Sequence, residues 1–190
     1  MMKEDQLYEL CKDAKFDEKL CVELIDDVPL NKIIENYNTT FLNTAFIYEN
    51  FKMFKMLLEK GADPNFYAEI DGRVLWDLQY GNDFEISEDK QLALVKLVLD
   101  HGADPNIAWE NETLMEYILW KVFNEVGDDN WEYIIKFFVY LIAYGGKLTN
   151  GMPIMYQTID KDKLNEYEFF FTEDRGRGEI LRNGERVAYI

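Results

Sequence analysis

A segment that occurs twice constrains the fold of this chain more than any other feature. The sequence LEKGADPN at residues 58–65 returns as LDHGADPN at residues 99–106, 41 residues later. The four residues before each copy, KMLL and KLVL, keep the same offset. Self-similarity with a period of about 20–50 residues is typical of repeat architectures, in which each unit buries its apolar surface against its neighbours.

The repeated segment predicts an amphipathic helix followed by its end. Gly61 and Gly102 stand where one residue must adopt positive φ, and Pro64 and Pro105 prevent the helix from resuming. A third, degenerate copy is expected over residues 136–144, which two glycines follow. Apolar residues at i, i+3 and i+4 give each of the first two copies a stripe to bury: Phe54, Leu57 and Leu58, and then Val95, Val98 and Leu99.

The stretch 40–65 resembles the ankyrin repeat. The motif of that family starts T-P-L-H-x-A, continues into a second helix and ends G-A-D-x-N, and this chain has TFLNTA and then GADPN without a gap. Phe41 replaces the proline of the motif and Asn43 its histidine. Two later units keep little more than the leucine of the motif, at Leu75 and Leu114. The resemblance implies stacked pairs of helices.

We therefore expect a mostly α fold, an ankyrin-like α-solenoid of about four helix pairs with a small C-terminal antiparallel β-hairpin or three-stranded sheet. Residues 1–36 would form an N-terminal capping helix pair, 37–152 the ankyrin-like repeats with extended inter-helix insertions, and 153–190 a C-terminal β cap. The insertions, around 82–90 and 124–130, are acidic and predict solvated loops or extended helix ends.

Apolar positions in the N-terminal segment predict the buried faces of its two helices. The residues that we expect to line them are Leu7, Leu10, Cys11 and Ala14 in the first helix, and Leu20, Leu24 and Val28 in the second.

The C-terminal segment has the pattern of β-strands. Residues 167–172 are short and aromatic, and the pair Asn183-Gly184 between apolar runs predicts a hairpin with a type I′ turn, which needs positive φ at both positions. Two interpretations of the basic residues here stay open: charges that protect exposed strand edges, or an anion-binding patch. These residues are Arg175, Arg177, Arg182 and Arg186.

The charge of the chain restricts its partners. With 37 acidic and 20 basic residues, the formal net charge is −17. Such a surface repels nucleic acids and anionic membranes and attracts cationic partners, although acidity can also serve solubility alone. No stretch approaches the roughly 18 apolar residues of a bilayer span, and the N-terminus lacks a signal-peptide pattern. We expect a cytoplasmic protein.

Side chains with catalytic chemistry are few. The single histidine, His101, stands at a helix end, where we expect it to hydrogen-bond exposed carbonyls. Cys11 and Cys21 lack metal-ligand spacing and predict buried free thiols in a reducing compartment. There is no G-x-S-x-G nucleophile motif, and 176–178 (GRG) is no phosphate loop because Lys-Ser/Thr is missing. We expect no enzymatic activity, cofactor or metal.

In ankyrin repeat proteins, partners contact the loop tips that precede each first helix and the exposed face of that helix. Tyr and Trp are frequent interface anchors, and packing against a neighbouring repeat is the alternative for each of them. Trp76 and Trp120 lie in helical segments and fit the core more readily. The resemblance implies three patches: Asn36, Tyr37, Thr39, Ile47 and Tyr48; Ile70, Asp71, Arg73 and Tyr80; and Trp109, Glu110 and Asn111.

These observations favour a monomeric, non-enzymatic protein-protein interaction module whose partner has a basic surface. A narrower hypothesis is an immunity protein that neutralises a toxin nuclease, because short acidic ankyrin-like proteins resemble the immunity proteins of bacterial toxin systems. A third hypothesis, from a different class, is a small anion or ligand binder that uses the C-terminal arginines.

Overall fold

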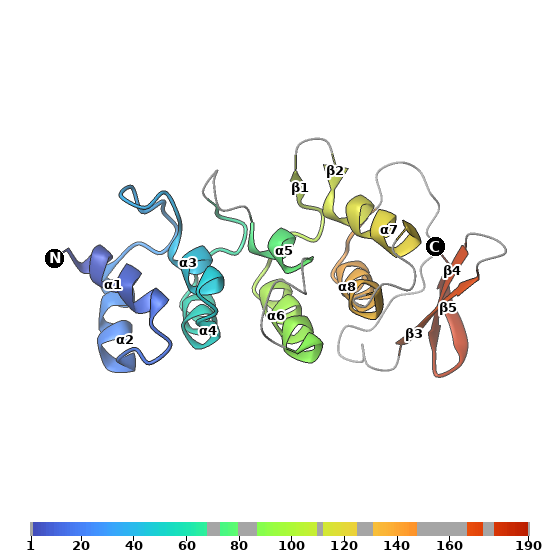
Figure 1. The fold of residues 1–190 in the computed structure, drawn as a ribbon, viewed down its shortest axis with the longest axis horizontal. Helices are drawn as coiled ribbons and strands as arrows, with labels where there is room; N and C mark the ends of the chain where they lie inside the picture. Colours follow the sequence, from blue (N-terminus) through green and yellow to red (C-terminus); the bar gives the residue numbers. More distant parts are fainter. Residues whose placement is uncertain are drawn as a thin grey trace. The chain divides into compact units, whose positions relative to one another are not determined.

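The chain is mostly helical, with a small antiparallel sheet near its C-terminus (Figure 1). The computed structural model describes residues 2–67, 73–79, 87–109, 112–124, 131–147, 167–172 and 177–189. The described part contains eight helices and five strands. The chain divides into two compact units, Met1–Glu85 with Lys96–Ala103 and Ile86–Val95 with Asp104–Ile190.

Contacting helix pairs account for most of the first unit. Helix α1 contacts α2, α3 contacts α4, and the two first helices α1 and α3 also contact each other (Figure 1). The expected N-terminal helix pair is present, and its capping role stays a prediction. The bounds are Lys3–Lys12 for α1, Glu18–Asp27 for α2, Phe41–Ile47 for α3, Phe51–Glu59 for α4 and Val74–Asp77 for the short α5.

The apolar stripes of these helices form the core. Phe54, Leu57 and Leu58 of α4 are all buried, as their spacing predicts. The ring of Phe46 from α3 lies 5.8 Å from that of Phe54, centroid to centroid. The expected stripe of α1 is only partly correct, since the helix ends at Lys12 and leaves Ala14 exposed in the following turn.

The expected stripe of α2 is wrong at one position. Leu20 is exposed because the buried face of α2 follows i, i+3, i+4 spacing from Cys21 through Leu24 and Ile25. Asp17 sets the start of this helix, since its carboxylate accepts hydrogen bonds from two backbone amides of the first turn.

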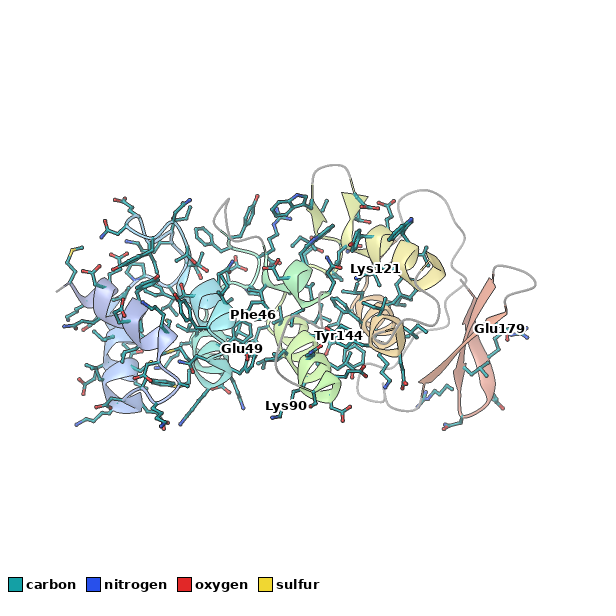
Figure 2. All side chains as sticks on the ribbon, in the orientation of Figure 1. Phe46, Glu49, Lys90, Lys121, Tyr144 and Glu179 are labelled. Atoms are coloured by element: carbon teal, nitrogen blue, oxygen red, sulfur yellow. The ribbon has the colours of Figure 1, made fainter. Side chains whose placement is uncertain are left out.

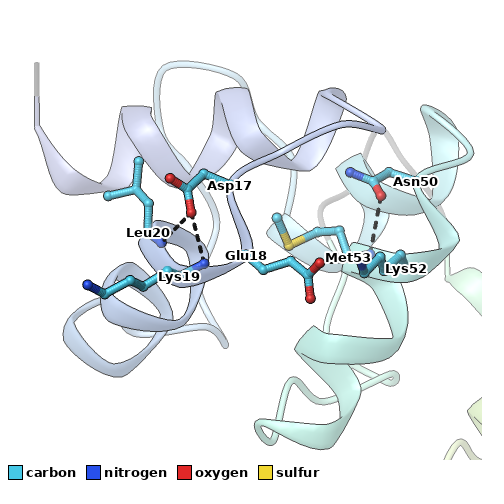
Figure 3. Close-up of polar contacts among 7 residues, drawn as sticks. All are labelled: Asp17, Glu18, Lys19, Leu20, Asn50, Lys52 and Met53. Atoms are coloured by element: carbon cyan, nitrogen blue, oxygen red, sulfur yellow. Dashed lines mark hydrogen bonds and ion pairs between the residues drawn. The ribbon is translucent and has the colours of Figure 1, made fainter.

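One buried asparagine joins the end of α1 to the start of α4. The side-chain oxygen of Asn50 caps α4 by accepting from Met53 N at 3.2 Å (Figure 3). Its amide nitrogen lies within hydrogen-bond distance of the carbonyl oxygens of Leu10 and Cys11, both at 3.2 Å, and of Asp13 at 2.9 Å. Asn50 thus caps α4 and gives the Cys11 carbonyl its hydrogen-bond partner, while the Leu10 and Asp13 carbonyls also accept from the backbone amides of Asp13 and Phe16.

The three glycine exits have the same geometry. Gly61, Gly102 and Gly145 have φ of 91°, 89° and 91°. In each exit the glycine amide donates to the carbonyl three residues back, and the next amide donates to the carbonyl five residues back. At the first exit, Gly61 N donates to Leu58 O at 3.0 Å and Ala62 N donates to Leu57 O at 2.9 Å. The repeated segment therefore ends its helices as predicted, in a left-handed residue that closes the last turn.

An asparagine side chain connects each exit turn to a preceding segment. Asn31 Nδ2 donates to Gly61 O at 3.3 Å, and Asn31 Oδ1 accepts from Asp63 N at 2.7 Å. The Asn31 side chain thus donates one hydrogen bond and accepts another, as the N–H and C=O groups of a backbone peptide do.

The same bridge recurs farther along the chain. In the second unit, Asn106 Nδ2 donates to Gly145 O at 3.3 Å and Asn106 Oδ1 accepts from Lys147 N at 2.7 Å. In the first unit, Asn65 Nδ2 donates to Gly102 O at 2.9 Å. The asparagine that ends the repeated segment is therefore a structural residue whose side chain holds the next exit turn.

The second unit contains a helix pair and two small sheets. Helix α6 spans the division between the units. The hairpin β1–β2 leads into α7, and α7 contacts α8. A Cβ on Gly146, after α8, would lie 2.6 Å from Met115 Sδ of α7. The bounds are Glu88–Asp100 for α6, Ala108–Trp109 for β1, Glu112–Thr113 for β2, Leu114–Asn124 for α7 and Trp131–Ala143 for α8.

The C-terminal sheet has the expected turn. Strands β3, β4 and β5 pair antiparallel in that order. Asn183 and Gly184 have φ of 51° and 80°, which confirms the predicted positive φ at both turn positions. The strands are Tyr167–Thr172, Arg177–Arg182 and Glu185–Tyr189.

The predicted insertions lie mostly outside the described residues. Their described ends are helical, since α6 begins at Glu88 and α7 continues to Asn124.

We predict that Asn50→Ala lowers the free energy of unfolding by about 2–4 kcal/mol, because it removes an N-cap and the side-chain donor of the buried Cys11 carbonyl. Urea denaturation measures this loss. Asp17→Ala is the matched control, since Asp17 caps α2 at an exposed end (Figure 3) and its loss should cost only about 1 kcal/mol. Equal losses for the two variants would show that the bonds from Asn50 to the end of α1 contribute nothing.

We predict that Gly61→Ala destabilises the protein by about 1–2 kcal/mol, because φ of 91° disfavours any Cβ. A Cβ there meets nothing within 4 Å, so the cost is conformational rather than steric. Gly61→Asn should cost less, since asparagine tolerates the left-handed region better. Thermal unfolding of both variants tests this order, and an Asn variant less stable than the Ala variant would contradict it.

Candidate functional site

Two short hairpins, which we call fingers, precede first helices. In the first finger, residues 34–39, Ile34 N donates to Thr39 O at 2.8 Å and Asn38 makes the turn with φ of 50°. The second finger, residues 108–113, is the β1–β2 hairpin, in which Trp109 pairs with Glu112. Each finger ends directly at the N-terminus of a helix, α3 or α7.

An exposed aromatic residue occupies the same position in both fingers. Tyr37 lies five residues before the motif leucine Leu42, and Trp109 lies five residues before Leu114. The two leucines are buried, whereas Tyr37 and Trp109 are each 41% exposed. The two fingers thus share an aromatic side chain in contact with solvent at the same distance from the helix that follows.

A second equivalent pair lies one residue past the end of α3 and within α7. Tyr48 and Trp120 both follow the motif leucine by six residues, and they are 50% and 53% exposed. Ile47, beside Tyr48, is also exposed.

The expectation that Trp120 belongs to the core is therefore wrong. The buried stripe of α7 consists of Leu114, Met115, Ile118 and Leu119, and Trp120 lies just past it on the solvent side. Trp76 is half-buried. The ring of Trp120 is 6.3 Å from that of Tyr117, centroid to centroid.

A basic side chain accompanies the aromatic residues of α7. Lys121 Nζ lies 5.7 Å from the centroid of the Tyr117 ring, and Figure 2 labels Lys121 on this helix.

The structure changes the predicted list of contact residues in several places. Asn36 is exposed, but Thr39 is buried and leaves the candidate surface, because its hydroxyl lies 3.3 Å from both Thr40 O and Thr44 Oγ1 in the first turn of α3. Arg73 is half-buried, with its guanidinium 4.3 Å from the ring of Tyr67. The remaining predicted residues lie outside the described part: Ile70, Asp71, Tyr80, Glu110 and Asn111.

Sequence reasoning missed the residues that complete the first patch. Tyr8 of α1 stacks on Tyr37 with ring centroids 3.7 Å apart and an interplanar angle of 8°. Lys12 Nζ lies 5.0 Å from the Tyr8 ring and 5.6 Å from the Tyr48 ring. Burial raises the pKa of the Tyr8 hydroxyl. The local sequence of α1 does not predict this contact, because only the tertiary packing brings α1 next to the finger and α3. We call Tyr8, Tyr37 and Tyr48 the tyrosine cluster.

The reactive side chains occupy structural positions. His101 Nδ1 lies 2.8 Å from Leu97 O, which confirms the predicted contact with a helix-end carbonyl. Cys11 and Cys21 are buried free thiols, as predicted, and Cys21 Sγ is 3.3 Å from Met53 Sδ. Burial raises the pKa of both thiols, that of Cys21 to about 11, so neither is a ready nucleophile.

The arginine patch is only partly described. Arg186 Nη2 forms an ion pair with Glu179 Oε1 at 3.0 Å across the β4–β5 hairpin, in agreement with the interpretation of hairpin charges. Arg175 lies outside the described residues, and for Arg177 only the backbone is described. In the described ranges, no group of three or more His, Cys, Asp or Glu residues is placed to hold a metal ion. None of the described helices has the length and apolar character needed to span a membrane.

No model of a known protein family matches the chain, and no curated protein matches it either.

We predict that Trp120→Ala changes the free energy of unfolding by less than about 1 kcal/mol, because half of this side chain is already in water. Leu119→Ala is the matched control, since the Leu119 side chain, next to Trp120 in the sequence, is buried and its truncation should cost about 2–4 kcal/mol. Urea denaturation of the two variants distinguishes a residue exposed for contact from one that packs. A loss for Trp120→Ala as large as that for Leu119→Ala would assign Trp120 to the core.

Proposed function

We propose that this chain is an ankyrin-like repeat protein without enzymatic activity, which binds a protein partner with a basic surface through its fingers and first-helix faces. The solenoid is supported by the recurring glycine exits, the recurring asparagine bridges and the contacts between the first helices of the first unit. In repeat proteins each unit stabilises its neighbours, and the turns at one edge are left to vary.

The observation that carries the binding function is the pair of equivalent exposed aromatic positions. Tyr37 and Trp109 lie in the fingers, Tyr48 follows the end of α3, and Trp120 lies within α7. Large aromatic side chains gain free energy when they leave water, so their exposure at equivalent positions supports a partner that covers them. Tyr and Trp are also the residues that most often dominate binding energy at interfaces.

The charge supports a cationic partner. A net charge of −17 accelerates association with a basic surface and makes it sensitive to salt. Neutralisation of a basic toxin nuclease is the narrower form of this proposal, and the same charge is its support.

Affinity capture from the native host, with the purified chain as bait, tests the proposal. We expect a partner that binds the wild-type chain and whose Kd, measured by calorimetry on the purified partner, rises at least about tenfold in the double variant Tyr37→Ala, Trp109→Ala, equivalent to about 1.4 kcal/mol. Raising the NaCl concentration should weaken the wild-type complex further.

Leu20→Ala is the control, because Leu20 is an exposed apolar residue on the second helix of its pair, away from the fingers. The control should leave the Kd unchanged. A partner that binds the double variant as tightly as the wild type, or whose affinity does not depend on salt, would refute the proposed surface or its charge.

A further inference from the structure

The tyrosine cluster already holds a cation from its own chain. The ammonium of Lys12 lies 5.0 Å from the ring of Tyr8 and 5.6 Å from that of Tyr48, within the range of cation–π attraction. The same ammonium lies 3.1 Å from both carboxylate oxygens of Glu9. Two aromatic faces and one carboxylate therefore surround a single positive charge.

Three elements position this group independently of Lys12. Asn50 ties the last turn of α1 to the start of α4, two residues after Tyr48. The finger brings Tyr37 onto the other side of Tyr8 in a parallel stack. The Tyr8 and Tyr37 rings are thus held against each other, and Tyr48 lies next to the segment that Asn50 fixes.

Lys12 is weakly held. Its ion pair with Glu9 joins neighbouring turns of one helix, and the Glu9 side chain is half exposed. Ion pairs within an exposed helix and cation–π contacts at exposed sites both contribute little to stability. A lysine side chain with four rotatable bonds can leave for solvent at a cost that a bound partner readily offsets.

We infer that the tyrosine cluster with Glu9 is a receptor for a lysine side chain of a basic partner segment, and that Lys12 occupies it when no partner is bound. The ammonium of Lys12 marks a position within cation–π distance of two rings that a partner lysine would take, and the net charge of −17 favours a basic segment as its source. This inference depends on the proposed function, because it names the chemistry that the first finger recognises.

The test uses the purified full-length chain and a lysine-rich hexapeptide, with a glutamine hexapeptide of equal length as the neutral comparison. Peptide affinity is measured by NMR titration, which also reports shifts of the tyrosine ring signals. We expect Tyr48→Leu to weaken lysine-peptide binding about two- to fivefold, the equivalent of one exposed cation–π contact. Tyr48→Phe keeps the ring and should bind like the wild type.

Removal of the Lys12 ammonium, which competes with the peptide, should change the peptide affinity in the opposite direction. Lys12→Met should strengthen binding about two- to fivefold, because the partner lysine no longer displaces Lys12. Lys19→Met is the matched control, since it makes the same change in net charge on α2, where Lys19 is exposed (Figure 3). It should strengthen binding less than Lys12→Met does.

Circular dichroism confirms that each variant remains folded, as expected for exposed or half-exposed positions. The inference is overturned if Tyr48→Leu binds the peptide like Tyr48→Phe, or if Lys12→Met and Lys19→Met have equal effects, since the acidic surface alone would then account for binding. Such a result leaves the proposed function standing where the captured partner still requires Tyr37 and Trp109.

Discussion

The asparagine bridge between successive helix exits is the interaction on which the repeated structure depends. A helix that ends in a left-handed glycine presents one carbonyl and one amide outward, and both need partners where the next segment packs against them. The amide of asparagine offers a donor and an acceptor at the right separation, so Asn31 and Asn106 each bind both groups of one exit turn. Glycine and asparagine in the repeated GADPN segment therefore have complementary roles, one to end a helix and the other to hold the next end.

The two fingers lie outside the GADPN segments that form these exits. The buried residues Leu114, Met115, Ile118 and Leu119 of α7 follow one stripe, whereas every residue of α3 from Phe41 to Phe46 is buried, and the fingers before the two helices are held by a few backbone hydrogen bonds. The aromatic residues of the fingers and of the following helices stay partly exposed, although Tyr37 stacks on Tyr8 and Trp120 on Tyr117, and their equivalent positions are the basis of the proposed binding surface. In the first unit Asn50 has a similar role. Its buried side chain joins α1 to α4 and so places Lys12 beside Tyr48.

Short-range physics explains why part of the structure could be predicted. The glycine exits, the Asn183-Gly184 turn and the contact of His101 with a helix-end carbonyl depend on φ, on capping and on residues within a few positions, all of which can be read from the chain. The stripes of α4 followed their spacing for the same reason. Errors arose where a helix face had to be chosen: Leu20 and Trp120 are apolar residues in helices, and only the rotation of the helix about its axis decides which of them meets solvent.

The sequence by itself determined where the helices stop, that the unit recurs, and which kinds of side chain stand in the fingers, because these properties follow from local conformational preference and from the repeat. Tertiary structure alone decided that Thr39 is buried, that Trp120 is exposed, and that Tyr8 and Lys12 from a separate helix complete the patch of Tyr37 and Tyr48. The physical reason is that a contact between residues some 30 to 40 positions apart depends on how whole helices pack, and no local preference encodes it.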